Sequence, residues 1–189
     1  MAESRIDFIK SWNEKANNEK DIVDRFMCRC ITLSALCQTW SALESPSNIG
    51  KDDGYVVKDL FKHFYKNIDC FRSDDVIASF RELVNGKALD GSQVIGKEET
   101  SRTNLNDLNG SADILVDWLN KSSHPNYDVN FKKRVAEAFA VIVREVRNNL
   151  FHGKKGHKID RDRELIKNTE QLLDVFITPI IADLDKRFS

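Results

Sequence analysis

The sequence predicts an all-α protein. Apolar residues recur at three- and four-residue steps along several long segments, which is the spacing of one helix face. Only 3 prolines and 8 glycines interrupt the 189 residues, and no Val, Ile and Tyr alternation is long enough for a sheet. A chain of this length buries roughly 70% of its unfolded surface. We therefore expect one helical domain over 1–189, a bundle of about five to seven helices.

The N-terminal half carries four helical patterns. A short amphipathic stretch at 4–18 precedes a stronger one at 20–44. The Pro and Gly residues of 44–50 end the second pattern, because neither residue type continues a helix easily. A third helix is expected over 52–68 and a fourth over 73–85.

The C-terminal half begins with a break. Four glycines interrupt a polar stretch at 86–110, which we expect to be a long loop. Helices are then expected at 111–120 and, as the most regular pattern of the chain, at 129–152. A last helix opens near Asp160. The pair Thr178–Pro179 is typical of a cap followed by a first-turn proline, so it predicts that a short terminal helix restarts there.

Composition excludes several classes of function. Lys and Arg total 29 against 30 Asp and Glu, so any nucleic-acid-binding surface must be local. The 4 cysteines lack zinc spacing, and Cys30 and Cys37 fit as small buried apolar residues. No motif for a metal or a cofactor is present. No apolar run approaches the roughly 20 residues of a membrane span, and no signal region opens the chain, so a cytoplasmic protein is expected.

The most informative segment lies at the end of the helix expected at 129–152. Asn148 and His152 are four residues apart and share a helix face, so Asn148 can orient the imidazole. Arg147 points about 140° away from His152 on an ideal helix, so both can meet a substrate only in a cleft beside the helix or one completed by a second subunit. A guanidinium binds phosphate and an imidazole moves protons near neutral pH, so the pair suits metal-free cleavage of RNA.

Basic residues surround this segment and could hold an RNA backbone, which would make binding sensitive to salt. The candidates are Arg144, Lys154, Lys155 and Lys158. A Lys, Arg and His cluster at a helix C-terminus is also favoured by the helix dipole alone. A purely structural role is therefore the alternative interpretation of the cluster.

The string Arg147-Asn148-Asn149-Leu150-Phe151-His152 resembles the R-x4-6-H signature of the HEPN superfamily, the higher eukaryotes and prokaryotes nucleotide-binding domains. The resemblance implies a metal-independent endoribonuclease of a toxin–antitoxin or anti-phage system. It also implies a homodimer whose two motifs share one cleft, with RNA and an antitoxin or regulatory protein as partners. Arg147 would bind the scissile phosphate, His152 would act as acid or base, and Asn148 would orient His152.

A second function stays open beside the nuclease. The chain could be a non-catalytic helical module that uses the same basic surface to hold nucleotide, RNA or a protein partner. The exposure of the motif separates the two hypotheses. A nuclease requires Arg147 and His152 to reach a cleft, whereas a non-catalytic module is expected if both are buried in hydrogen bonds within the chain.

Overall fold

The computed structural model describes residues 2–72, 77, 78, 110, 111, 113–115, 117, 118, 128–151 and 160–188. These residues contain helices and no strand, so the all-α prediction is confirmed. The elements with defined bounds are α1 (Ala2–Asn18), α2 (Ile22–Leu43), the 3-10 helix η1 (Pro46–Asn48), α3 (Asp53–His63), the 3-10 helix η2 (Tyr65–Arg72), α6 (Val129–Phe151) and α7 (Asp160–Phe188).

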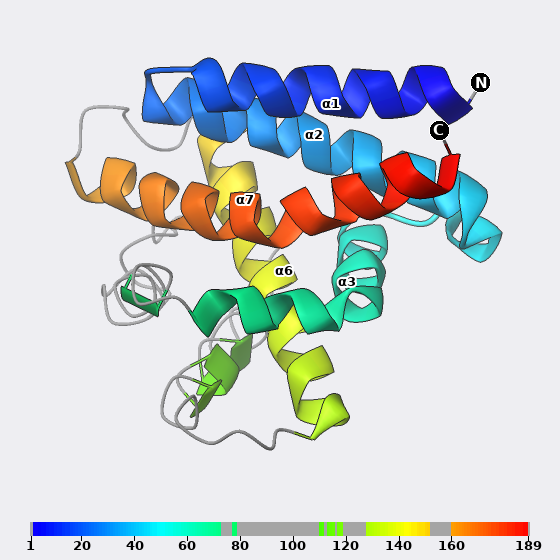
Figure 1. The fold of residues 1–189 in the computed structure, drawn as a ribbon. Coiled ribbons are helices and arrows are strands. Elements are labelled where there is room, and N and C mark those ends of the chain that lie inside the picture. Colours follow the sequence, from blue (N-terminus) through cyan, green and yellow to red (C-terminus); the bar gives the residue numbers. More distant parts are fainter. Residues whose placement is uncertain are drawn as a thin grey trace.

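The long helices cross one another in layers. α1 and α2 form an antiparallel hairpin, α7 packs against both, and α6 passes behind α7 to meet α3 (Figure 1). The two termini lie close together at one end of the molecule (Figure 1). An ion pair of 3.0 Å between Lys10 Nζ in the middle of α1 and Asp185 Oδ1 near the end of α7 joins these two helices.

One cluster of buried apolar side chains connects all of these helices. At its centre the rings of Phe61 and Phe176 stack with centroids 4.3 Å apart, and Phe71 meets Phe139 edge-on at 5.3 Å. The four rings come from α3, α7, η2 and α6. Aromatic pairs of this kind add about 0.5–1.5 kcal/mol to the free energy of burial. They hold α3 against the C-terminal part of the bundle, which positions the site described below.

Two sequence-based boundaries need correction. The helix expected over 52–68 ends at His63, and the chain continues as η2. The side chain of Asn67 leaves the local pattern and donates from Nδ2 to the carbonyl oxygen of Phe176 at 3.0 Å. The tighter 3-10 path also buries Ile68 and Phe71 completely. A contact with α7, which lies far away in the sequence, therefore decides the end of α3.

The restart predicted at Thr178–Pro179 is wrong, because α7 runs unbroken from Asp160 to Phe188 with Pro179 inside it. Thr178 does not cap a helix, since its hydroxyl donates to Asp174 Oδ1 at 3.0 Å. Proline in a helix interior forfeits a hydrogen bond and costs about 3 kcal/mol. The apolar stripe of α7 offsets that cost, because it is buried on both sides of the proline at Phe176, Ile177, Ile180, Ile181 and Leu184.

Some predicted elements fall outside the described residues. The helix expected at 73–85 and the loop expected at 86–110 are among them, apart from residues 77, 78 and 110, which are helical. Every described residue of 111–120 is helical, as predicted. Among the described helices, none combines the length and the apolarity that crossing a bilayer requires.

Candidate functional site

The site forms around Arg147, one turn before the end of α6. Ala136, Ala140 and Val143 precede Arg147 on the same side of this helix, and all three are buried. Arg147 continues their stripe at the point where α6 leaves the core. Its side chain is consequently 17% exposed rather than sealed.

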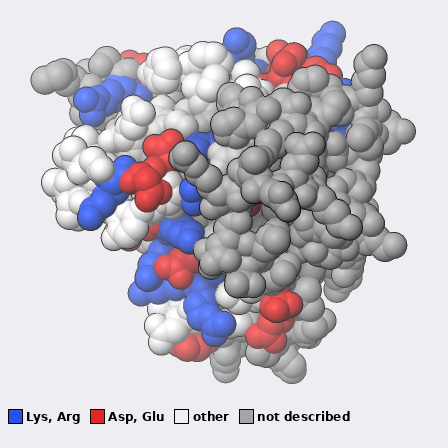
Figure 2. All heavy atoms as spheres, turned by 180° about the vertical axis from the view of Figure 1, so that it is seen from behind, with Lys and Arg blue, Asp and Glu red and all other residues white. Residues whose placement is uncertain are grey.

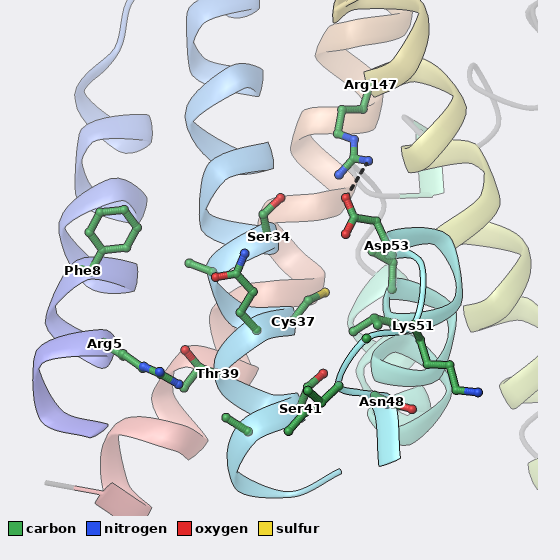
Figure 3. Close-up of a pocket in the computed structure, with 17 residues that line it drawn as sticks. Arg5, Phe8, Ser34, Cys37, Thr39, Ser41, Asn48, Lys51, Asp53 and Arg147 are labelled. Carbon is green, nitrogen blue, oxygen red and sulfur yellow. Dashed lines mark ion pairs between the residues drawn. The ribbon is translucent and has the colours of Figure 1, made fainter. Parts of the chain in front are cut away.

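Arg147 lines a hollow of about 670 Å³, which we call the α2 hollow (Figure 3). The hollow crosses the outer face of α2, from Arg5 and Phe8 of α1 to Asp53 at the start of α3 (Figure 3). Its floor is formed by small or polar side chains of α2, namely Ser34, Ala35, Cys37, Gln38, Thr39, Ser41 and Ala42. Ligand pockets commonly enclose 300–1,000 Å³, so the volume suits a nucleotide-sized group.

A second, shallower hollow of about 370 Å³ adjoins the first, and we call it the Asn148 hollow. Cys30, Ile31, Ser34, Arg147 and Asn148 line it. Because Ser34 and Arg147 line both hollows, the guanidinium lies at their junction. A phosphate bound by Arg147 would have neighbouring space on two sides, as an internal phosphate of a chain requires.

The guanidinium of Arg147 is only loosely engaged. Within the described part of the chain its one ion pair joins Nη2 to Asp53 Oδ2 at 3.8 Å (Figure 3). The Asp53 side chain is 84% exposed in the first turn of α3, behind the capping residue Asp52. A guanidinium has five N–H donors, and this arrangement leaves most of them for a ligand.

Arg29 of α2 shows the opposite arrangement. Its side chain is 2% exposed, Nε donates to Glu170 Oε1 at 3.1 Å, and Nη2 lies 2.8 Å from Asp174 Oδ1. The side-chain oxygens of Asn13 and Asn17 and the backbone oxygen of Asn13 also accept hydrogen bonds from it. Arg29 is thus a saturated cross-link between α1, α2 and α7, whereas Arg147 has a single ion pair among the described residues.

Two cysteines lie beside the site but offer no nucleophile. Burial raises the pKa of the Cys30 and Cys37 thiols to about 12, and the nearby Arg147 charge opposes this rise only in part. A thiol with such a pKa stays protonated at neutral pH and is a poor attacking group. Both residues serve as small core side chains, as the sequence predicts.

Arg144 lies one turn before Arg147 and lines neither of the two hollows. Its guanidinium crosses Gly54 so closely that a Cβ there would lie 2.6 Å from Cζ. Gly54 therefore lets the start of α3 approach α6. On the face seen from behind, described Lys and Arg side chains are interspersed with Asp and Glu (Figure 2).

The structure brings together part of the predicted site. Arg147 and Asn148 share the Asn148 hollow. His152, Lys154, Lys155 and Lys158 lie outside the described residues. Among the described residues, no group of three or more His, Cys, Asp and Glu side chains is arranged to hold a metal ion.

Sequence reasoning missed Arg5, Phe8 and Lys51, which also line the α2 hollow. Phe8 carried a usable signal, since it is an aromatic residue outside the apolar stripe of Ile6 and Ile9. Arg5 and Lys51 carried none, because only the tertiary fold brings them to the α2 hollow. Comparisons of the chain with models of protein families, with curated proteins and with solved structures gave no match.

Proposed function

We propose that this chain is a metal-independent endoribonuclease with a HEPN-like motif, in which Arg147 and His152 act on one phosphodiester link. The observation that carries the proposal is the state of Arg147, which is partly exposed, loosely paired and situated between two adjoining hollows. A guanidinium in this state suits an anionic ligand with groups on both sides of its charge. Asn148, which the motif predicts to orient His152, lines the smaller hollow.

The chemistry follows from the two side chains. His152 takes the proton of a ribose 2′-OH, and the freed oxygen attacks the adjacent phosphorus. Arg147 donates two parallel hydrogen bonds to the phosphate and stabilises the charge that develops on it. The bond from phosphorus to the 5′-oxygen breaks, and that oxygen takes up a proton. The products are a 2′,3′-cyclic phosphate and a 5′-hydroxyl, and the step requires no metal ion.

A second copy of the chain fits the same chemistry. One imidazole removes the first proton, and a second acid must return a proton to the leaving oxygen. A homodimer with two facing motifs supplies a second His152 for this purpose. The proposal extends to a cytoplasmic toxin or anti-phage protein, whose activity an antitoxin or regulatory protein would restrain.

The test is cleavage of a mixed RNA pool in the presence of EDTA. We expect the wild-type chain to produce fragments with 2′,3′-cyclic phosphate ends, and the His152→Ala variant to produce none. Absent cleavage, a requirement for added metal, or full activity of His152→Ala would each contradict the nuclease. RNA binding without cleavage would instead support the non-catalytic module.

Replacing Asp53 with Asn is expected to strengthen RNA binding by up to about fivefold, because an exposed ion pair is worth roughly 0–1 kcal/mol. The Asp53 carboxylate is the described group that competes with phosphate for Arg147, with its Oδ2 3.8 Å from Nη2. Fluorescence anisotropy with a labelled oligoribonucleotide measures the change. Asp113→Asn is the matched control, since Asp113 is exposed and lines neither hollow. Weaker RNA binding by Asp53→Asn than by the parent would contradict a competition between Asp53 and phosphate for Arg147.

A further inference from the structure

The α2 hollow continues away from Arg147 toward α1, where the proposed chemistry has no use for it. Accepting RNA as the substrate, we infer that this hollow binds a short run of unpaired nucleotides beside the scissile phosphate, with one base stacked on Phe8. The site would then select an unpaired nucleotide on one side of the scissile phosphate and would not distinguish which base it carries.

Charge is the first argument for this occupant. The charged residues that line the hollow are Arg5, Lys51, Arg147 and Asp53, three cations and one carboxylate. Arg5 reaches from α1 toward Thr39, and Arg147 reaches from α6 toward the opposite end of the hollow (Figure 3). Among the described residues, Arg5 makes no ion pair, so its charge is not neutralised within that part of the chain. Two separated guanidinium groups match the repeating phosphates of a single strand.

The second argument is an exposed aromatic ring. Phe8 is 49% exposed and lines the hollow, and its ring centroid lies 6.2 Å from that of Trp12. A nucleobase can stack on such a ring only after it has left a duplex, so the platform selects unpaired RNA. Ile49 is 68% exposed at the opposite rim and adds apolar surface for a base or ribose.

The floor supplies the third argument. The short side chains of Ser34, Ala35 and Ala42 project little from α2 into the hollow, so a ribose or base can approach the helix backbone closely. Ser41 of the same floor is 6% exposed, and its Oγ has no hydrogen-bond partner in the described part of the chain.

The decisive experiment compares variants of Phe8 in a His152→Ala background, in which the RNA stays intact. Binding of a labelled single-stranded oligoribonucleotide of about eight nucleotides is measured by anisotropy. Phe8→Leu keeps the apolar contact but removes the ring, so we expect affinity to fall about 5- to 100-fold. Phe8→Tyr keeps the ring and is expected to bind as tightly as the parent. The same strand in a duplex is expected to bind more weakly than the single strand.

The charge argument has its own variant. Arg5→Gln is expected to reduce the slope of log affinity against log salt by about 1, as the loss of one phosphate contact would. Lys66→Gln is the matched control, because Lys66 is an exposed cation of η2 that does not line the hollow. Equal salt slopes for Arg5→Gln and the parent would overturn the role of Arg5.

Tryptophan fluorescence gives an independent signal. Trp40 and Trp118 are each 2% exposed, whereas Trp12 is partly exposed beside Phe8. Base stacking on Phe8 should therefore quench Trp12, and Trp12→Phe should abolish the quenching.

Three results would overturn the inference: Phe8→Leu binding like the parent, duplex binding as tightly as single strand, or Phe8→Asp changing the oligomeric state while RNA affinity stays constant. The last result would make this surface an interface between copies of the chain. Cleavage by the wild-type chain with no effect of Phe8 variants would overturn the base platform alone. Stacking on Phe8 without cleavage would overturn the nuclease alone.

Discussion

Arg29→Met is expected to lower the free energy of unfolding by about 3–5 kcal/mol, because removing one partner of a buried ion pair leaves the other charge uncompensated. Arg29 is 2% exposed and holds Glu170, whose side chain is 7% exposed, at 3.1 Å. Asn13 and Asn17 would lose a donor at the same time. Urea denaturation followed by circular dichroism measures the loss.

The loss should depend on pH. Burial raises the pKa of Glu170 above the ordinary 4.5, and the hydrogen bond and charge of Arg29 oppose this rise. Between the ordinary pKa and the raised pKa of the folded state, the folded state therefore binds more protons than the unfolded state. The contribution of Glu170 to stability falls as pH rises through that interval. Without Arg29 the interval extends to higher pH. The variant should lose more stability at about pH 7.5 than at about pH 5.

Two further variants test the explanation. Arg25→Met removes a guanidinium one turn earlier on α2, which among the described residues donates only to the carbonyl oxygen of Glu19, so about 1 kcal/mol should be lost. Combining Arg29→Met with Glu170→Met removes both buried charges and should recover much of the stability. If Arg29→Met alone stays within about 1 kcal/mol of the parent, the cross-link does not hold the bundle together.

Much of the fold could be predicted from periodicity. The helix expected at 20–44 lies at Ile22–Leu43, and the one expected at 129–152 lies at Val129–Phe151. Both carry apolar faces long enough to override weak local signals. The predictions failed where tertiary burial opposed a local rule. The buried stripe of α7 carries the helix through Pro179, and the bond from Asn67 to Phe176 replaces the end of α3 with a 3-10 path.

The candidate site was predictable only within a single helix. Arg147 and Asn148 are adjacent on α6, so a motif can identify them together. The rest of the α2 hollow comes from α1, from α2 and from the segment before α3. No spacing rule connects Arg5 or Phe8 to a residue about 140 positions later, since only helix packing places them around the same hollow. The sequence likewise did not indicate the partners of Arg29, although Arg29 and Arg147 both lie on predicted helices.

Arg147→Ala is expected to lower RNA cleavage about 100- to 1,000-fold, the usual cost of removing one donor to a charged transition state. Arg147→Lys should also be strongly impaired, because an ammonium keeps the charge but not the two parallel hydrogen bonds. Initial rates on a single-stranded substrate measure both effects. Arg134→Ala, an exposed arginine earlier on α6 that lines neither of the two hollows, should cleave like the parent.

Stability separates a functional arginine from a structural one. Within the described residues Arg147 makes one loose ion pair with an exposed carboxylate, so its removal should cost at most about 1 kcal/mol of unfolding free energy. Arg29, with four partners, should show the reverse pattern of lost stability. If Arg147→Ala destabilised the chain as strongly as Arg29→Met, or cleaved RNA normally, the guanidinium between the two hollows would be part of the scaffold. Lost cleavage in a chain that unfolds like its parent would instead leave contact with the scissile phosphate as the role of Arg147.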